Sequence, residues 1–403
     1  MNVSLAWRNI WRNRTRSLII ILSVTIGLFA GIFVLALYQG IMISRVRIVI
    51  DSEVGHIQIH NPKFKDDFDP KYTLQGATVK DSLKNLDKIK FVADRSITLG
   101  MLSTTTGSAN VKINGILPEA ENKASQLKDK IISGNELSMN GKQGILVGKK
   151  LADKMKLKLG SKLVLTFADT NNELTAGAFG VLGIYQSDNA PLDELNVYVL
   201  KPVLNTYLGI DQGSHEVVVL LNRDDDLDIV RNRIATLFPK LLVETWKETS
   251  PETNLMVGYV DQFAIIYVVI IMFALAFGII NTMLMSVLER TREIGMLTAL
   301  GMNRKRVFVL ILTETILLTF VGVPFGILLS WFTSNYFGHV GIDISSFSEA
   351  AMSGFGFSSM IYPEFPVDSL PVVMIIVFLT ALISALFPSI KAIKLQPADA
   401  LRH

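Results

Sequence analysis

The chain has 403 residues, of which 50% are hydrophobic and 19% are charged, a balance typical of proteins inserted in a membrane. Its net charge of +3 is too small to indicate a nucleic-acid-binding protein, and the basic residues flank apolar stretches instead of forming one patch. The absence of cysteine excludes disulfides, thiolate metal sites and a thiol nucleophile.

Residues 1–16 combine tryptophan and arginine ahead of the first apolar run. Trp7, Ile10 and Trp11 share one helical face, and Arg8 and Arg12 share another. This pattern predicts a cytoplasmic amphipathic helix that lies on the membrane surface. The alternative is a group of basic residues that only orients the first span.

Four apolar runs are long enough to cross a hydrocarbon core of roughly 30 Å. We expect transmembrane helices at residues 17–44, 259–288, 307–337 and 367–390. A cleaved signal peptide is the alternative for the first run, but its apolar core would be only about 7 to 15 residues long. Four spans place both ends of the chain on one side of the membrane.

Lysine and arginine are concentrated before the first span, in the loop 289–306 and in the tail 391–403. Short basic segments stay in the cytoplasm, so both termini are predicted to be cytoplasmic. The loop 338–366 contains acids but no Lys or Arg and is predicted to lie outside, in the periplasm. The long segment 45–258 is then also periplasmic, because long domains cross the membrane largely regardless of charge.

Within residues 45–258 the hydrophobic period changes from helical to alternating. Strands are expected at Ile57 and Ile59, Val111 and Ile113, Leu163 and Leu165, Val197 and Val199, and Val217 to Leu221. Helical patterns run from Lys149 to Lys156 and from Asp226 to Phe238. In the second of these, Val230, Ile234 and Leu237 form the expected buried stripe. The mixture predicts a large extracytoplasmic α+β domain divided into two subdomains.

Motifs for catalysis and for nucleotide binding are missing from the sequence. No segment has the glycine spacing of a P-loop followed by Lys and Ser or Thr, and no serine lies between the two glycines of a nucleophile elbow. His56 and His60 are a suggestive pair, but on a strand they would be about 13 Å apart, too far to share a metal. We interpret them as surface or strand-end histidines, and we expect no catalytic, cofactor or metal site in the chain.

Glu314 is the one acid well inside an apolar run. Such a charge costs about 2.5 to 3.5 kcal/mol at a bilayer centre on insertion scales, which makes it a candidate functional residue. It follows the basic loop by about two turns, so we expect it to reach the interface or to pair with Arg304 or Arg306. The alternatives are a proton or cargo pathway and an intramembrane enzyme, and no second acid, histidine or serine motif supports the latter.

The loop 289–306 contains a short helical pattern, charged in its first half and apolar in its second, with a glycine stop. It reads LERTREIGMLTALGM from Leu288 to Met302 and resembles the coupling helix of the FtsX/MacB-type ABC transporter permeases, which docks into a groove on the ATPase. The opening residues, the closing residues and the order of one span, a large domain and three spans are similar to the same family. The resemblance implies an ATPase-coupling role for Glu289, Arg290, Arg292, Glu293, Ile294, Gly295, Leu297, Leu300 and Gly301.

Within this family, residues 55–59, 145–160 and 181–185 are most similar to the lipoprotein-releasing LolC/LolE branch. The LolC type has a proline-bearing hook for a soluble carrier before the strand that matches Val181 to Tyr185. Here the connection from Asp169 to Ala176 is short and has no proline. The chain therefore looks more LolE-like, or like one subunit of a homodimer.

The resemblance implies a multi-pass inner-membrane permease with no cofactor of its own. ATP would be bound by a separate ABC ATPase dimer, since only sixteen residues precede the first span. The other implied partners are a second permease copy or a sister permease, membrane lipids, and a lipoprotein or another amphiphilic cargo. Two alternatives are MacB-like efflux of peptides or drugs from the periplasm and FtsX-like regulation of cell-wall hydrolases without transport.

Overall fold

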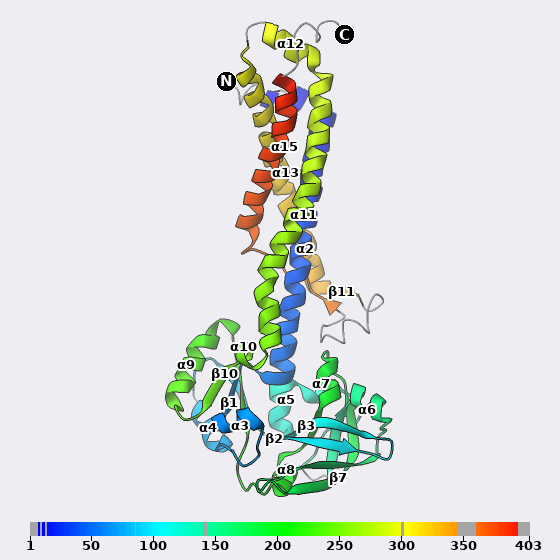
Figure 1. The fold of residues 1–403 in the computed structure, drawn as a ribbon, viewed down its shortest axis with the longest axis vertical. Helices are drawn as coiled ribbons and strands as arrows, with labels where there is room; N and C mark the ends of the chain where they lie inside the picture. The colour runs from blue at the N-terminus through cyan, green and yellow to red at the C-terminus, as the bar shows by residue number, and fades with distance from the viewer. Residues whose placement is uncertain are drawn as a thin grey trace. The chain divides into compact units, whose positions relative to one another are not determined.

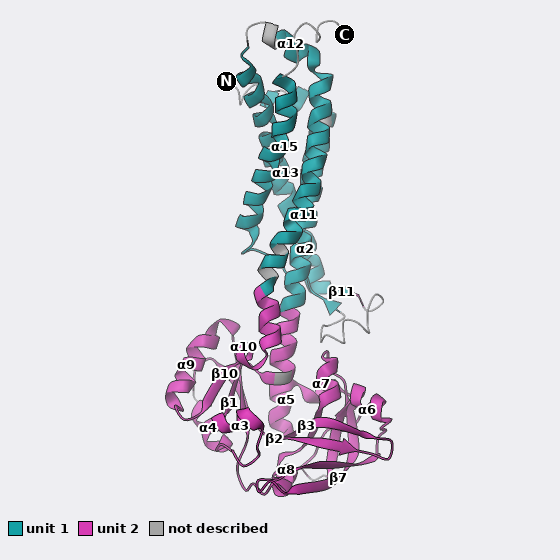
Figure 2. Cartoon of the chain, in the orientation of Figure 1, with its two compact units in different colours: residues 1–42, 259–343, 360–403 teal, residues 43–258, 344–359 magenta. Residues whose placement is uncertain are grey.

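The computed structural model describes residues 7–8, 10–12, 14–84, 86–139, 143–299, 302–344 and 360–393. The chain divides into two compact units, coloured separately in Figure 2. Unit 1 contains Met1–Met42, Tyr259–Asp343 and Met360–His403, and unit 2 contains Ile43–Gly258 and Ile344–Ser359. In the described residues, unit 1 is almost entirely helical, whereas unit 2 mixes strands with short helices (Figure 1).

Four long apolar helices dominate unit 1 (Figure 1). They are α2 (Arg14–Val49), α11 (Pro251–Glu289), α13 (Arg304–Val340) and α15 (Leu370–Ile393). Each is long and apolar enough to cross a membrane, which confirms the expected four spans. Both α2 and α11 are longer than the apolar runs predicted, because α2 continues to Val49 and α11 begins at Pro251, both in unit 2.

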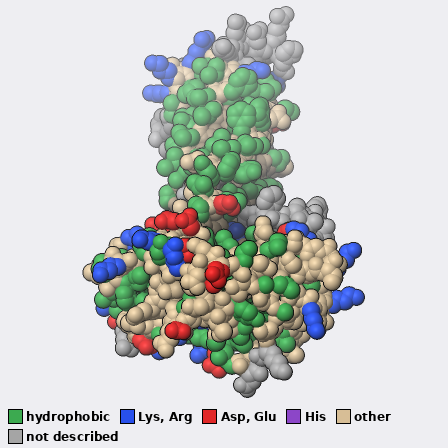
Figure 3. All heavy atoms as spheres, turned by 60° about the horizontal axis from the view of Figure 1, so that its bottom comes forward, with side chains coloured by type: hydrophobic (Ala, Val, Ile, Leu, Met, Phe, Trp, Pro, Cys, Tyr) green, Lys and Arg blue, Asp and Glu red, His purple; other side chains and the backbone are tan. Residues whose placement is uncertain are grey.

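The helices of unit 1 pack through side chains that recur every three or four residues. On α2 the buried residues include Ile20, Val24 and Leu28, and α13 approaches them closely through two glycines. A Cβ atom added at Gly322 or Gly326 would lie 3.0 Å from Val24 or Leu28, so only a small residue fits there. Hydrophobic side chains cover much of the outer surface of these helices, and Lys and Arg gather towards one end (Figure 3).

Between α13 and α15, the described residues form the two-residue strands β11 (Ile342–Asp343) and β12 (Met360–Ile361). The chain after β12 lies against α2, where the Glu364 backbone N–H donates to the Ala36 carbonyl over 3.0 Å. A Cβ at Gly40 would lie 2.0 Å from the Tyr362 carbonyl oxygen, so this contact requires glycine on α2. Residues 345–359 of the expected loop 338–366 lie outside the described residues.

Unit 2 contains ten strands in its described part. They are β1 (Ile57–His60), β2 (Ile89–Ser103), β3 (Ser108–Ile116), β4 (Ile131–Gly134), β5 (Gly144–Gly148), β6 (Lys162–Ala168), β7 (Leu174–Tyr185), β8 (Asn196–Leu200), β9 (Glu216–Leu221) and β10 (Leu242–Thr245). The hydrogen-bonded order is β10-β1-β9-β2-β3-β8-β5-β7-β4, and β6 pairs with both β2 and β7. Strands lie at every predicted strand position, so the α+β class is confirmed.

The short helices of unit 2 connect these strands. They are α3 (Pro62–Asp67), α4 (Gly76–Leu83), α5 (Pro118–Ser125), α6 (Lys149–Met155), α7 (Ala190–Leu195), α8 (Lys201–Leu208), α9 (Leu227–Leu237) and α10 (Trp246–Thr249). The expected stripe on α9 is wrong at one position, because Leu237 is 50% exposed. Val230 and Ile234 are buried, and the next residue on their face, four positions on, is the half-buried Phe238.

Strand β2 divides unit 2 into two subdomains. Its residues Ile89–Arg95 pair with β9, and Ser96–Ser103 pair with β3. The pairings β2-β3-β8-β5-β7-β6-β2 close a six-stranded barrel. Inward and outward side chains alternate along β6, where Leu163 and Leu165 are buried in the barrel core and Val164 is exposed. The other subdomain has its own hydrophobic core on β1, β9 and β10.

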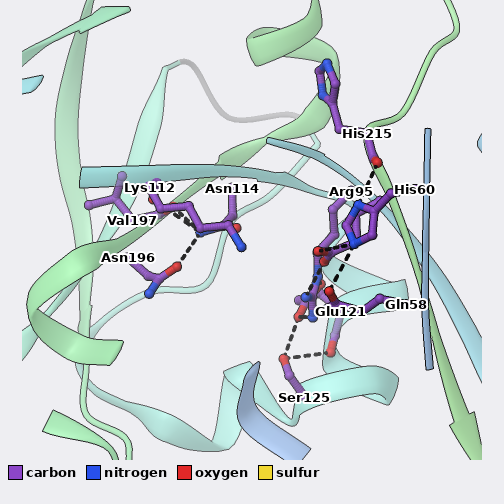
Figure 4. A network of polar contacts seen from close by, with 11 residues as sticks. Gln58, His60, Arg95, Lys112, Asn114, Glu121, Ser125, Asn196, Val197 and His215 are labelled. Atoms are coloured by element: carbon purple, nitrogen blue, oxygen red, sulfur yellow. Dashed lines mark hydrogen bonds and ion pairs between the residues drawn. The ribbon is translucent and has the colours of Figure 1, made fainter. Parts of the chain in front are cut away.

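A buried charged cluster joins β2, α5 and β9 where the subdomains meet (Figure 4). Arg95 Nη2 lies 2.7 Å from Glu121 Oε1, and Arg95 Nη1 lies 3.0 Å from Glu216 Oε1. Burial alone would raise the pKa of Glu216, but the nearby charges of Lys112 and Arg95 reverse this effect and lower the pKa. All of these contacts are internal, so the cluster stabilises the strand arrangement of unit 2.

Candidate functional site

The predicted coupling residues lie at the end of the helical unit, where α11 stops and α12 (Thr291–Ala299) begins. The Thr291 hydroxyl donates to the Leu288 carbonyl over 2.6 Å, and the Ile294 N–H donates to the Arg290 carbonyl over 2.9 Å. These bonds hold the turn between the two helices. Leu300 and Gly301 lie outside the described residues, as does the side chain of Leu297.

Glu293 on α12 connects two arginines from different parts of the chain. Its Oε2 atom lies 2.9 Å from Arg290 Nε, and its Oε1 atom forms an ion pair with Arg12, ahead of the first span. Partial burial would raise the pKa of Glu293, but hydrogen bonds from Arg290 and Arg12 outweigh this effect and lower the pKa. Glu293 is therefore a carboxylate at neutral pH, and α12 is tied to the N-terminal segment.

Glu314 is buried on α13, and Arg290 Nη1 lies 3.4 Å from its Oε2 atom. The expected partners, Arg304 and Arg306, are exposed in the first turn of the same helix, and Arg290 takes their place. The reason is geometric, because eight to ten residues of helix separate them from Glu314 by about 12 to 15 Å. Arg290, in the turn just after α11, approaches Glu314 from another helix.

The four side chains form a chain of alternating charge: Arg12, Glu293, Arg290 and Glu314. Beside it lies a cavity of about 20 Å³, enough for about one water molecule. The cavity is lined by Met283, Ser286, Val287, Arg290, Glu293, Ile294, Val307, Leu310, Ile311 and Glu314. A movement of α12 would therefore have to carry these groups along or break their ion pairs.

The outer surface of this site is formed by Glu289, Arg292 and Met296, whereas Gly295 is buried. Met296 is not among the predicted coupling residues, although it is 51% exposed. Its spacing of four residues from Arg292 puts both on one face of α12, and this signal was available in the sequence. An exposed Met next to charged groups is typical of surfaces that bind another protein.

The histidines of unit 2 lie in different surroundings from those expected. His56 and His60 do flank β1 at its ends, but both are buried, because β1 lies between β9 and β10. His56 Nε2 lies 2.9 Å from Asp224 Oδ1, and His60 Nε2 lies 3.0 Å from Gln58 Oε1. Within the described ranges, no group of three or more His, Asp or Glu residues could hold a metal ion.

The connection from β6 to β7 occupies the position at which the LolC type has its hook. It is a tight hairpin turn of residues 169–173, in which the Asp169 N–H donates to the Glu173 carbonyl over 2.9 Å. The strand expected at Val181 to Tyr185 is the second half of β7. No hook of the LolC type is present in this turn.

Comparison with known proteins gives two family matches that together cover most of the chain. Residues 17–237 match the MacB-like periplasmic core domain, and residues 265–397 match the FtsX-like permease C-terminal region. The first match alone includes more than half of the chain.

Three relatives illustrate the range of the family. An uncharacterised ABC transporter permease, YvrN of Bacillus subtilis, is 37% identical over 132 residues, covering 31% of this chain and 26% of that protein. The macrolide export ATP-binding/permease protein MacB of Campylobacter jejuni is 24% identical over 363 residues, covering 84% and 54%. The lipoprotein-releasing system transmembrane protein LolC of Xylella fastidiosa is 22% identical over 312 residues, covering 72% of each.

The chain thus spans about a quarter of YvrN and about half of MacB. Four apolar helices, the large α+β domain between the first and second of them, and both family matches agree with one another. The chain belongs to the FtsX/MacB/LolC family of ABC transporter permeases.

Proposed function

We propose that this protein is the permease subunit that couples ATP hydrolysis on a separate ABC ATPase dimer to the release of lipoproteins, or a related amphiphile, from the inner membrane. The likeness to LolC, which covers 72% of both chains, supports the cargo class. No cofactor is needed in this chain, since ATP would be bound by its partner.

The observation that carries the coupling role is the pairing of Glu293 with both Arg12 and Arg290. A short helix that transmits a push from an ATPase must not slide on the helices behind it. Glu293 and Arg290 tie α12 to the N-terminal segment and, through Glu314, to α13. We propose that Glu289, Arg292 and Met296, which are exposed on this helix, contact the ATPase.

In this proposal both termini and α12 are cytoplasmic, and unit 2 is periplasmic. The basic residues that flank α11, α13 and α15 at the α12 end support this orientation. Energy is required because each CH₂ group of an acyl chain contributes about 0.8 kcal/mol to membrane binding. Thermal motion does not supply this for a whole chain, so ATP hydrolysis would drive the extraction.

MacB-like efflux of peptides or drugs is the second candidate function, because the MacB likeness covers 84% of this chain. FtsX-like regulation of cell-wall hydrolases is a third. The three functions differ in what the ATPase-driven movement acts on, and the charge network at α12 would serve each of them equally well.

Depletion of the protein, followed by proteomics of separated inner and outer membranes, distinguishes these functions. Lipoprotein release predicts that outer-membrane lipoproteins accumulate in the inner membrane, and that wild-type protein restores their distribution. An unchanged distribution, with greater sensitivity to a macrolide or an antimicrobial peptide, would instead support efflux. An unchanged distribution with a cell-separation defect would support hydrolase regulation.

A further inference from the structure

Strand β2 leaves the subdomain of β1, β9 and β10 and enters the barrel within a few residues. It pairs with β9 as far as Arg95 and meets β6 only at Gly100. On this side of β2, no described strand pairs with residues 96–99. A side chain fills the gap, because the Ile97 N–H donates to the Nδ1 atom of the buried His215 over 2.9 Å.

His215 connects the two subdomains through both of its ring nitrogens. Its Nε2 atom lies 3.0 Å from the carbonyl oxygen of Pro70, in the loop between α3 and α4. The His215 backbone N–H donates to the Arg95 carbonyl over 2.9 Å, and the ring stacks on Phe64 of α3 with centroids 4.6 Å apart. The residue therefore ties the first barrel residues of β2 to a loop of the β1 subdomain.

The partners of the ring determine its protonation state. A backbone N–H donates and a carbonyl oxygen accepts, so Nδ1 of His215 carries a lone pair and Nε2 carries the proton. The ring is therefore neutral. A protonated ring has an N–H on both nitrogens, and its Nδ1–H would face the Ile97 N–H. The buried Ile97 N–H would then lose its acceptor, which is costly.

His60 is the second buried histidine at this joint, and its surroundings differ. Its Nδ1 atom lies 3.2 Å from the His215 carbonyl oxygen, and its Nε2 atom lies 3.0 Å from Gln58 Oε1 (Figure 4). Glu216 Oε2 lies 3.8 Å from the same Nε2 atom. Both ring nitrogens face oxygen atoms that can accept, so a proton on His60 breaks no hydrogen bond. Of the two histidines, His215 alone has a ring nitrogen that must stay an acceptor.

We propose that His215 is a proton-sensitive link between the two subdomains of unit 2, and that its protonation releases the Ile97 N–H and lets the barrel move relative to the β1 subdomain. An opened joint would return the ring to water and to its ordinary affinity for protons, so acid favours the open joint. This inference goes beyond the proposed function. In the periplasmic orientation proposed for unit 2, it would make the permease respond to acid outside the inner membrane.

The charges around His215 support a transition in acid. Burial lowers its pKa from 6.5 to about 4, although the hydrogen bond to the Pro70 carbonyl opposes this shift. The positive charges of Lys201 and of protonated His60 lower the pKa further, and the Glu216 carboxylate opposes them. The ratio of open to closed joints should rise by up to about tenfold for each pH unit from 6.5 down to about 4. The other charged groups at the joint are Asp94 paired with Lys80 and Lys201, Arg95 paired with Glu121 and Glu216, Lys65 paired with Glu244, and Lys112 near Glu216 and His60.

Distances between paired spin labels test the link in the full chain, which has no cysteine of its own. Ile229→Cys on α9 and Leu174→Cys on β7 place one exposed label in each subdomain. Leu174→Cys with Leu195→Cys, on α7 beside β5 of the barrel, is the matched control pair. As the pH of the protein in detergent falls from about 7.5 to about 4.5, the first pair should show a growing population with a longer distance. The control pair should not change, and far-UV circular dichroism should show a folded chain at each pH.

Variants of the two histidines assign the effect. His215→Asn and His215→Gln keep an amide acceptor and donor but do not titrate, so the distance in the first pair should no longer depend on pH. His60→Gln should retain the dependence. Either His215 variant suffices, and the wild-type titration is informative without them.

Three results would overturn the proposal. They are an unchanged distance in the wild-type protein over this pH range, an equal pH dependence in the His215 variants, and a distance change that only accompanies loss of the circular dichroism signal. The measurement needs neither an ATPase nor a cargo, so its outcome is independent of the proposed function.

Discussion

Arg290 and Glu314 are 24 positions apart in the sequence, yet Arg290 Nη1 lies 3.4 Å from the buried Glu314 carboxylate. Arg290 also donates to Glu293 on α12, so one guanidinium serves a carboxylate inside the helical unit and another at its end. A buried pair of this kind adds little net stability over an apolar pair of the same volume, but loss of one partner is costly. This asymmetry makes the pair testable.

The Arg290→Met variant should lower the free energy of unfolding by about 3 kcal/mol, because it removes the Arg290 guanidinium from beside the buried Glu314 carboxylate. The lower part of the usual range is expected, since the Arg290 side chain is 16% exposed. The double variant Arg290→Met with Glu314→Leu should recover most of the loss. Thermal unfolding of the full chain in detergent measures both, and an equal loss in the single and double variants would contradict the pairing.

Glu293→Gln should uncouple the ATPase while leaving membrane insertion intact. The amide cannot hold both Arg12 and Arg290 by charge, so stimulation of ATP hydrolysis by cargo should fall about tenfold, equivalent to ~1.4 kcal/mol. Glu252→Gln, at an exposed position near the start of α11, is the control and should couple normally. The exchange variant Arg12→Glu with Glu293→Arg should restore part of the coupling. Full coupling in Glu293→Gln would remove α12 from the proposed mechanism.

Acidification should destabilise the protein through His215. Burial lowers the pKa of His215 from its ordinary value of 6.5 to about 4. The hydrogen bond to the Pro70 carbonyl opposes this shift only in part. Between these values the unfolded chain binds more protons than the folded one, so this contribution to stability is present above pH 6.5 and is lost as the pH falls. The loss is at most about 3 kcal/mol. His215→Gln should flatten the pH dependence of unfolding, and His339→Gln, at an exposed position, should keep the wild-type slope.

Asp193 should show the opposite dependence on pH. Burial raises its pKa to about 6 from 3.8, despite hydrogen bonds from Ser187. The folded chain therefore binds more protons between these values, and this contribution is fully present below pH 3.8 and is lost as the pH rises through about 6. Relative to wild type, Asp193→Asn should gain up to about 3 kcal/mol between pH 4 and pH 7. No change in the difference between the two proteins over this range would contradict the raised pKa.

Accessibility of single cysteines should report the proposed orientation. Tyr362→Cys, in the exposed chain after β12, should react with a membrane-impermeant thiol reagent added to intact cells with a permeable outer membrane. Arg304→Cys, at the exposed start of α13, should react only after the inner membrane is opened. The reverse pattern would overturn the orientation, and the absence of native cysteine keeps the background low.

Much of the architecture follows from the sequence alone because it depends on local periodicity. The four spans are long apolar runs, and the strand around Ile113 alternates apolar and polar residues. The family resemblance likewise rests on contiguous motifs, of which residues 288–302 are the longest. The prediction that Leu237 is buried on α9 was wrong. Leu237 and Phe238 are adjacent apolar residues, and which of the two is buried depends on the side of the helix on which the core lies.

Only the tertiary structure decided the partners of the polar groups and the division of unit 2. Arg290 contacts Glu314 because α11 and α13 bring these distant residues together, and Arg12 contacts Glu293 because the N-terminal segment lies beside α12. Strand β2 serves both subdomains, so no linker or change in composition marks their boundary. Periodicity reports which face of an element is apolar, whereas ion pairs and barrel closure depend on long-range contacts that leave no local pattern in the sequence.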